Sequence, residues 1–509
     1  MKKTIGCFLA TFICVTGFAQ SIDSLRFTIL QLNDVYEIAP LVGGTQGGMA
    51  RVATLRKELL ARDSNTITVL AGDFVSPSLI GTLSDTAEKC DTKVAGRHMV
   101  EVMNKTGVDY VTFGNHEFDI KLALLSKRLN ESTFKWVNSN VWKDNHAPFV
   151  KVQNGVNDTI RAYDIHTFHF SNGSSLELGI IGVTLPFNKT QPVFYGDVDS
   201  AVNAAYQQLK GQCDMVVAIT HLSIEEDIHL AKSVPGLSLI LGGHEHTASD
   251  TLIGNVPICK ADANAKSVYI HHISFDSATK KASIHSELRM INSSIQPDPI
   301  VDKVVEGWVK YADTIMKKMG YHPDDSLLFA KVPLEGRESE IRNHPTNYTK
   351  IIANALFTSE NKLDIALFNS GSLRVDDQLP GTITEYDILR SLPFGGKLVL
   401  MNLKGGVLQN VLTIGTGKNR KSGGFLQFAN ASLSTDVNNP KWYIGNRQLD
   451  TNKIYKVLLP EFVAMGNESN LNFLKQYIYN TPSAFIIKNK QVNNDIRDLV
   501  INYLKFFQN

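Results

Sequence analysis

Short apolar runs and polar clusters alternate along the first half of the chain. Five of the runs end directly in Asn, Asp, His or Gly residues, which are poor strand formers and therefore indicate loops at strand ends. We predict strands over residues 27–32, 66–70, 108–113, 215–220 and 237–241, and later over 269–275 and 281–291. Apolar residues at helical spacing predict helices over residues 47–62, 94–104 and 200–210. This alternation is typical of a mixed α/β fold.

A proline-containing break separates this pattern from a second one. Pro297 and Pro299 precede residues 301–318, whose apolar positions predict an amphipathic helix that could connect two domains. Beyond it, residues 364–368 and 398–403 are predicted strands, and residues 349–357 and 385–392 are predicted helices. We therefore expect a first domain over residues 20–295, a linker helix within 296–326 and a second α/β domain over 327–509.

The N-terminus has the pattern of a secretory signal peptide. Lys2 and Lys3 precede an apolar run over residues 5–18, which Ala19 ends, so we expect residues 1–19 to be cleaved and the protein to be periplasmic or secreted. The run is shorter than the roughly 20 residues that a membrane span needs, so we expect no stable membrane insertion. Because no small residue stands shortly before Cys14, we do not expect a lipoprotein anchor.

Composition sets limits on partners and redox chemistry. The 509 residues are 43% hydrophobic and 20% charged, as in an ordinary soluble protein. The net charge of +1 gives no reason to expect nucleic acid as a partner, and nothing in the sequence indicates the oligomeric state. Outside the predicted signal, Cys90, Cys213 and Cys259 remain. One disulfide with one free thiol is open, but we favour three buried thiols.

The polar clusters contain the side chains of a two-metal site. In α/β folds the carboxyl ends of strands meet at the ligand site, so the clusters should converge. Two divalent ions about 3.5–4 Å apart suit phosphate-ester hydrolysis, because they hold the phosphoryl oxygens and activate a water. Asp73 suits the bridging position, and the other candidate ligands are Asp34, Asn115, His221, His244 and His246.

His116 and Asp119 are the candidate catalytic pair. His116 follows the candidate ligand Asn115, and when protonated it could stabilise developing charge or protonate the leaving oxygen. Asp119, three residues later, could orient its ring. Taken alone, each Asp or His of these clusters is more often a turn residue, a helix cap or a solvated side chain. The interpretation as a site depends on their complementary types at the ends of separate runs.

These segments resemble the signature blocks of the 5′-nucleotidase family of metallophosphoesterases. The order and spacing of the segments around Asp34, Asp73, residues 114–119, His221 and residues 242–246 match the family. Residues 369–374, 381–384, 393–395 and 423–425 resemble its later blocks, so the resemblance extends from about residue 27 to the C-terminus. It implies an N-terminal four-layer αββα metallophosphoesterase sandwich and a C-terminal α/β substrate-binding domain, with the active site between them.

The resemblance also implies roles for residues. Asp34, Asp73 and His246 would hold one divalent ion, and Asp73, Asn115, His221 and His244 the other; the sequence leaves Mn, Zn, Mg and Co open. His116 and Asp119 would be the catalytic dyad. The substrate would be a nucleotide. Arg374 would bind its phosphate or carboxylate-like oxygens, and Phe425 would stack on its base. Asn369 belongs to the same substrate-binding block.

Two departures from the family pattern leave alternatives open. Tyr36 stands where the family's first block has a metal-binding histidine, so it could bind as phenolate, leave the position to water or point away. No aromatic residue stands at Asn470, where a second stacking residue is expected, although Phe473 is close. Arg337 and Arg342 are either substrate arginines or solvated surface residues.

We therefore expect a 5′-nucleotidase that releases phosphate from nucleoside monophosphates. The altered stacking loop keeps 2′,3′-cyclic nucleotides and nucleotide sugars open as substrates. A nucleotide-binding relative with weak catalysis, caused by Tyr36, is a further alternative.

Overall fold

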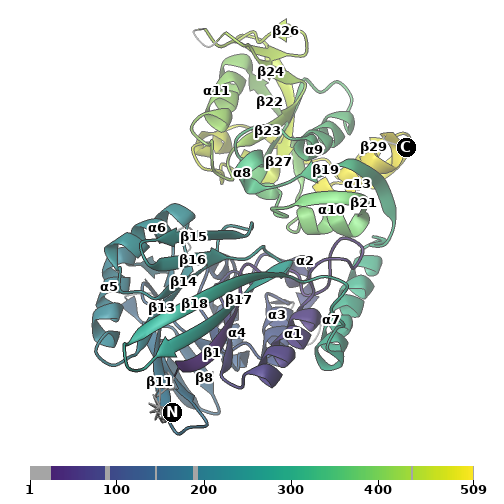
Figure 1. The fold of residues 1–509 in the computed structure, drawn as a ribbon. Coiled ribbons are helices and arrows are strands. Elements are labelled where there is room, and N and C mark those ends of the chain that lie inside the picture. The colour runs from purple at the N-terminus through teal and green to yellow at the C-terminus, as the bar shows by residue number, and fades with distance from the viewer. Residues whose placement is uncertain (1–23, 86–91, 144–145, 187–192, 437–438, 508–509) are drawn as a thin grey trace, which may run out of the picture.

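The computed structural model describes residues 24–85, 92–143, 146–186, 193–436 and 439–507 as two bodies joined by a long helix (Figure 1). The predicted signal peptide and Cys90 lie outside the described residues. Cys213 and Cys259 are free thiols; Cys259 is fully buried as expected, whereas Cys213 is only partly buried, so the expectation was wrong for Cys213. Within the described part of the chain, no helix combines the length and the apolar character that crossing a bilayer requires.

Two six-stranded sheets pack face to face in the N-terminal body (Figure 1). The first has the order β18 (Lys281–Met290), β17 (Ser267–Asp276), β1 (Ser24–Leu32), β2 (Thr66–Leu70), β5 (Tyr110–Val111) and β6 (Lys135–Trp136). The second has the order β10 (Tyr163–His169), β11 (Ser175–Thr184), β13 (Met215–His221), β14 (Leu239–Gly242), β16 (Val256–Lys260) and β15 (Ser249–Ile253). Phe27 and Ile29 of one sheet and Val217 and Leu241 of the other belong to the core between them.

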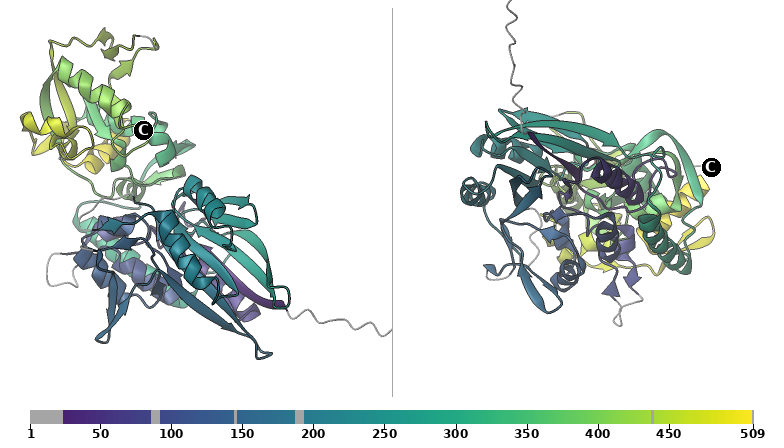
Figure 2. Two further views of the ribbon diagram at one scale, coloured as in Figure 1. Left: turned by 90° about the vertical axis from the view of Figure 1, so that its left-hand side faces the viewer. Right: turned by 60° about the horizontal axis from the view of Figure 1, so that its bottom comes forward.

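Helices cover both outer faces of this sandwich. The helices α1 (Met49–Arg62), α3 (Arg97–Thr106) and α4 (Leu122–Glu131) bury apolar residues such as Val52 and Met99 against the first sheet. The helices α5 (Val198–Leu209) and α6 (Ile224–Ser233) bury Val202 and Leu230 against the second. Figure 2 shows these layers from two further sides. The expected four-layer αββα arrangement is therefore confirmed.

Parallel pairing brings the predicted strand ends to one edge. In the first sheet β1 pairs with β2 and β2 with β5, and in the second β11, β13 and β14 pair, all in parallel. Each predicted strand and helix of this body has a counterpart, with ends shifted by a few residues. The strand expected over residues 108–113 is shorter, because only Tyr110 and Val111 pair before the chain turns toward the site.

The helix α7 (Pro299–Lys318) connects the two bodies. Asp298 caps it by accepting hydrogen bonds from the backbone N–H groups of Ile300 (3.2 Å) and Val301 (3.1 Å), and Pro299 begins it, where no intrahelical N–H is needed. Its apolar residues Val301 and Val305 belong to the same core as α1 and α3. The connector helix thus packs against the N-terminal body. The exact domain limits stay a prediction.

The C-terminal body is built on a five-stranded sheet with helices on both faces. Its order is β23 (Leu426–Ala429), β20 (Ile365–Asn369), β27 (Ile454–Pro460), β22 (Leu398–Lys404) and β28 (Tyr479–Asn480). The helices α9 (Asn347–Thr358) and α13 (Ile496–Phe507) lie on one face and α11 (Gly405–Thr416) on the other. Two further strands, β19 (Ser326–Glu335) and β21 (Gln378–Thr384), form a separate antiparallel pair before α10 (Glu385–Ser391).

Candidate active site

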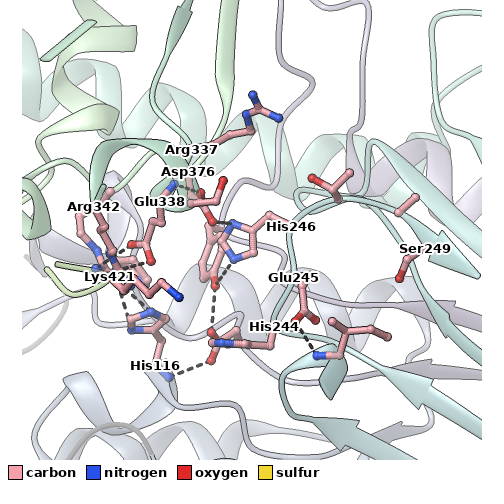
Figure 3. A pocket seen from close by; sticks show the side chains of 18 of the residues that line it. His116, His244, Glu245, His246, Ser249, Arg337, Glu338, Arg342, Asp376 and Lys421 are labelled. Carbon is pink, nitrogen blue, oxygen red and sulfur yellow. Dashed lines mark hydrogen bonds and ion pairs between the residues drawn. The ribbon is translucent and has the colours of Figure 1, made fainter. Parts of the chain in front are cut away.

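A cavity of about 570 Å³ lies where the polar strand ends of the sandwich face the C-terminal body (Figure 3). Both bodies contribute to its wall. The N-terminal body contributes Tyr36, Asp73, His116, His244, Glu245 and His246, among others. The C-terminal body contributes Arg337, Glu338, Arg342, Arg374, Asp376 and Lys421. The predicted strand-end clusters therefore converge in the structure, and their function as an active site stays a prediction.

Asp34, Asp73 and His221 form its buried floor. Their ligand atoms all lie within 4.8 Å of one another. Nε2 of His221 is 3.1 Å from Oδ2 of Asp73 and 4.0 Å from Oδ1 of Asp34. Its Nδ1 donates to the carbonyl oxygen of Ala71 at 2.8 Å, which leaves Nε2 to face the carboxylates.

The other three predicted metal ligands lie beside this floor. Oδ1 of Asn115 is 3.2 Å from Nε2 of His221, and Nε2 of His246 is 3.3 Å from Oδ1 of Asp34. The His244 ring meets the His221 ring edge to face at 5.4 Å between centroids, and its backbone N–H donates to Asp34 at 2.9 Å. The structure thus brings all six side chains together. Their roles as metal ligands stay predictions.

The backbone at the floor is held in an unusual conformation. Asp34, Asp73 and His244 have φ angles of 53°, 55° and 84°, in the left-handed region that residues with a side chain rarely adopt. Such conformations cost free energy and persist where the surroundings enforce them. Three of them within one cluster agree with a functional constraint on these loops.

The buried charges of the floor compensate one another. Burial raises the pKa of Asp73, but His221 and His116 outweigh it and hold that pKa well below its usual range. Burial lowers the pKa of His221, but Asp73 and Asp34 raise it to about 9. Two buried carboxylates therefore require positive charge beside them. Divalent cations would supply that charge, and the carboxylate, amide and imidazole donors suit Mn, Zn, Mg or Co.

Tyr36 points into this cluster. Its hydroxyl is 2.9 Å from Oδ2 of Asp73, 3.3 Å from Oδ1 of Asp34 and 3.2 Å from Nε2 of His246. The alternative that Tyr36 points away from the site is therefore wrong. Burial, followed by the charges of Asp73 and Asp34, raises its pKa well above 10, so the hydroxyl is neutral and donates to a carboxylate.

His116 and Asp119 form a hydrogen-bonded pair on one turn. Both lie on the 3-10 helix η1 (His116–Asp119), and Nδ1 of His116 is 2.6 Å from Oδ2 of Asp119. The backbone N–H of His116 donates to Oδ1 of Asp73 at 2.8 Å, which ties the pair to the floor. Nη2 of Arg374 lies 2.8 Å from Nε2 of His116. The pair therefore faces the cavity and the C-terminal body.

Comparison with known proteins agrees with this geometry. Residues 27–248 match the calcineurin-like phosphoesterase family, and residues 327–476 match the C-terminal domain of 5′-nucleotidase. The chain belongs to the 5′-nucleotidase family of metallophosphoesterases. It is therefore a phosphoester hydrolase of a metal-dependent class, and the expected family resemblance is confirmed.

Relatives of this family match the chain over most of its length. The chain is 25% identical to the 5′-nucleotidase of Bos taurus, over 87% of this chain and 83% of the relative. It is 25% identical to the snake venom 5′-nucleotidase of Crotalus adamanteus, over 87% and 82%. The crystal structure of a 5′-nucleotidase precursor from Thermus thermophilus superposes with a TM-score of 0.71 at 23% identity, covering 94% of this chain and 96% of that one. The last comparison shows a shared fold.

The arginines expected in the family's substrate site differ in their surroundings. Arg374 and Arg342 both contact the carboxylate of Glu338, Arg374 at 3.2 Å, and both side chains are largely buried in the cavity wall. Arg337 also lines the cavity but pairs with Glu335 and is 40% exposed. Arg342 is therefore buried in the cavity wall, whereas Arg337 is partly exposed there, and a substrate-binding role for either stays a prediction.

Asn369 and Phe425 do not reach the cavity wall. Asn369 is buried, donates to Oε2 of Glu468 at 2.9 Å and accepts from Oγ of Ser372 at 2.8 Å. Phe425 is only 3% exposed and is not among the residues that line the cavity. Their substrate-binding roles stay predictions, and each would require a rearrangement that exposes the side chain.

Sequence reasoning assigned no role to residues that hold the loops in place. Glu117 accepts hydrogen bonds from the backbone N–H groups of Asp73 (2.9 Å), Phe74 (2.9 Å), Val75 (3.0 Å) and Gly114 (2.5 Å). The position of Glu117 between His116 and Asp119 is the one sequence feature that could have indicated its importance. The buried Lys260 donates to the carbonyl oxygens of Leu222 (2.7 Å) and Gly243 (2.8 Å), next to His221 and His244. No comparable sequence feature indicated a role for Lys260.

Proposed function

We propose that this chain is a secreted or periplasmic 5′-nucleotidase that uses two divalent metal ions to release phosphate from nucleoside monophosphates. The observation that carries the proposal is the meeting of six ligand-type side chains, the His116–Asp119 pair and Arg374 around one cavity. Relatives named 5′-nucleotidase, aligned over most of their length, support the substrate class.

In this proposal the floor holds the ions. Asp34, Asp73 and His246 would hold one ion, and Asp73, Asn115, His221 and His244 would hold the other. Bound divalent ions supply positive charge for the phosphoryl oxygens and an activated water. Their number and identity belong to the proposal, because this donor set accepts several metals.

The chain's own residues position the phosphate and the leaving oxygen. Asp119 holds the Nδ1 proton of His116, so Nε2 is the atom that faces the substrate. When Nε2 carries a proton, it can donate that proton to the leaving oxygen. The phosphate would enter between Nε2 and Arg374, and the planar guanidinium would bind its oxygens in place of His116.

A second candidate substrate class follows from the cavity wall. Apart from histidines, Tyr36 is the one aromatic residue among the described residues that line the cavity. With Phe425 buried, no Phe or Trp ring and no second Tyr ring is among the described residues that line the cavity. Cyclic nucleotides or nucleotide sugars, bound mainly through phosphate and ribose, would depend less on such a ring.

The test is phosphate release from a panel of nucleotides. Purified protein would be assayed with nucleoside monophosphates, 2′,3′-cyclic nucleotides and nucleotide sugars after addition of Mn²⁺, Zn²⁺, Mg²⁺ or Co²⁺. We expect the monophosphates to be hydrolysed fastest. Faster turnover of the other two classes would favour the second candidate, and no turnover of any substrate would refute the enzyme proposal.

The dyad has a matched control within the chain. His116→Ala should lower turnover by about 10²–10⁴-fold while metal binding persists, because the variant loses its proton donor. His229 also pairs with an aspartate, Asp199, at 2.8 Å, but on the surface. His229→Ala should keep wild-type turnover. Equal rates for the two variants would refute the role of His116.

A further inference from the structure

One short segment of the C-terminal body makes three charged contacts with the N-terminal body. It lies between η3 (Ser370–Ser372) and β21. Nη2 of Arg374 is 2.8 Å from Nε2 of His116, Oδ2 of Asp376 is 2.6 Å from Nδ1 of His246, and Oδ1 of Asp377 is 2.9 Å from Nζ of Lys266. Figure 3 shows the contact between Asp376 and His246 at the cavity. The segment therefore contacts His116 of the predicted dyad and His246, one of the predicted metal ligands.

Asp376 is held in place from its own side. One carboxylate oxygen accepts the backbone N–H of Glu338, and the other accepts Nδ1–H of His246. Its φ angle of 37° is in the left-handed region, so the backbone is shaped around this position. The side chain is 16% exposed, as is that of His246. The contact is therefore made by two largely buried side chains, and Asp376 is held in position by its own backbone and by Glu338.

This contact fixes which nitrogen of His246 faces the floor. Because Nδ1 donates to Asp376, Nε2 is the nitrogen that lies toward the floor, 3.3 Å from Oδ1 of Asp34. A carboxylate behind a metal-binding histidine holds its tautomer and ring orientation. His221 obtains the same restraint from Ala71, within its own body. His246 obtains it from the other body.

We propose that Asp376 is a positioning residue for His246, so that seating the C-terminal body on the sandwich completes one metal site. The inference rests on the metal roles given under the proposed function. It links two properties of the molecule: metal affinity at the His246 site depends on the contact between the bodies. Metal bound there would in turn stabilise the docked arrangement, because such coupling is reciprocal.

The neighbouring residue Asp377 offers a matched control. Both aspartates make an ion pair between the bodies, but Asp377 contacts Lys266 and no residue of the floor. The full-length protein would be stripped of metal with a chelator and titrated with Mn²⁺ by isothermal titration calorimetry. We expect Asp376→Ala to weaken one of two Mn²⁺ sites by about 10–100-fold, the effect of removing such an outer partner. Asp377→Ala should stay within about threefold of the wild type.

Several results would overturn the inference. Wild-type affinity in Asp376→Ala would exclude the positioning role but leave the proposed function standing. Equal weakening in both alanine variants would refute the specific role of Asp376, because loss of an ion pair that does not contact His246 would then have the same effect. If the wild-type protein binds no Mn²⁺, both this inference and the proposed two-metal function are refuted. If Asp376→Ala does not fold, Asp376→Asn keeps an acceptor oxygen, and it should bind the weaker Mn²⁺ less tightly than Asp377→Asn does.

Discussion

Tyr36 shows how much one residue can change a site that is otherwise familiar. The family resemblance expects a metal-binding histidine there, and the structure instead places a neutral phenol within 2.9 Å of Asp73 and 3.3 Å of Asp34. The hydroxyl donates to a carboxylate, whereas an imidazole would offer a lone pair to a cation. The sequence showed that tyrosine replaces the expected histidine, but it did not show whether the Tyr36 side chain points into the site. Residue type alone does not determine the orientation of a side chain.

Replacing Tyr36 by histidine should tighten metal binding. The imidazole adds a ligand where the phenol now donates a hydrogen bond, so we expect the weaker of the two Mn²⁺ affinities to rise by about tenfold or more. Tyr36→Phe removes only the hydroxyl and should not tighten binding to that extent. Titration calorimetry of the metal-free proteins measures both. An unchanged affinity in Tyr36→His would mean that this position does not reach the ion.

At the scale of elements, the apolar runs predicted the strands well. The conformation of the loops after these strands could not be predicted from the sequence. The strand expected over residues 108–113 pairs over only two residues because Gly114 lies against the Asp73 loop; a Cβ there would be 2.1 Å from Oδ1 of Asp73. Glu117 then gathers four backbone N–H groups from the two loops. Such anchoring depends on where two loops meet, which a local pattern does not record.

Glu117→Gln should destabilise the N-terminal body. Glutamine presents an NH₂ group to backbone donors, so at least one buried N–H is left unpaired, at a cost of about 1–3 kcal/mol each. We expect a loss of about 3 kcal/mol in unfolding free energy, measured by urea denaturation with chelator present. Glu131 pairs with Arg128 but is 38% exposed, and Glu131→Gln should cost less than about 1 kcal/mol. Similar losses in both variants would contradict the anchoring role.

At the scale of the whole molecule, the two bodies and the connecting helix could be predicted, but the contacts across the cavity could not. Arg374 lies 258 positions after His116, and no periodic pattern relates them. The candidate metal ligands could be grouped from the sequence because they follow strand ends and their types complement one another; their roles stay predictions. Asp376 lies in a loop of ordinary composition, so only the docking of the bodies reveals its contact with His246.

Docking of the connector helix on the sandwich should depend on pH through His98. Its ring is fully buried between α3 and α7, 5.8 Å from the Trp308 ring, and Nε2 is 3.1 Å from Oγ of Ser78. Burial, followed by the charge of Arg128, lowers its pKa from 6.5 to about 3. Below pH 6.5 the unfolded chain therefore takes up a proton that the folded chain does not, and stability falls as the pH falls toward 3.

The free energy of unfolding should therefore be lower at pH 5.0 than at pH 7.5. From these pKa values His98 should cost about 2 kcal/mol of stability between pH 7.5 and pH 5.0. His98→Gln should lower stability at both values, since it disturbs a packed site, but should reduce the loss between them by about that amount. His272 is exposed, so His272→Gln should keep the wild-type difference. Urea denaturation followed by tryptophan fluorescence reports the change, and an undiminished difference in His98→Gln would show that the ring is already charged in the folded protein.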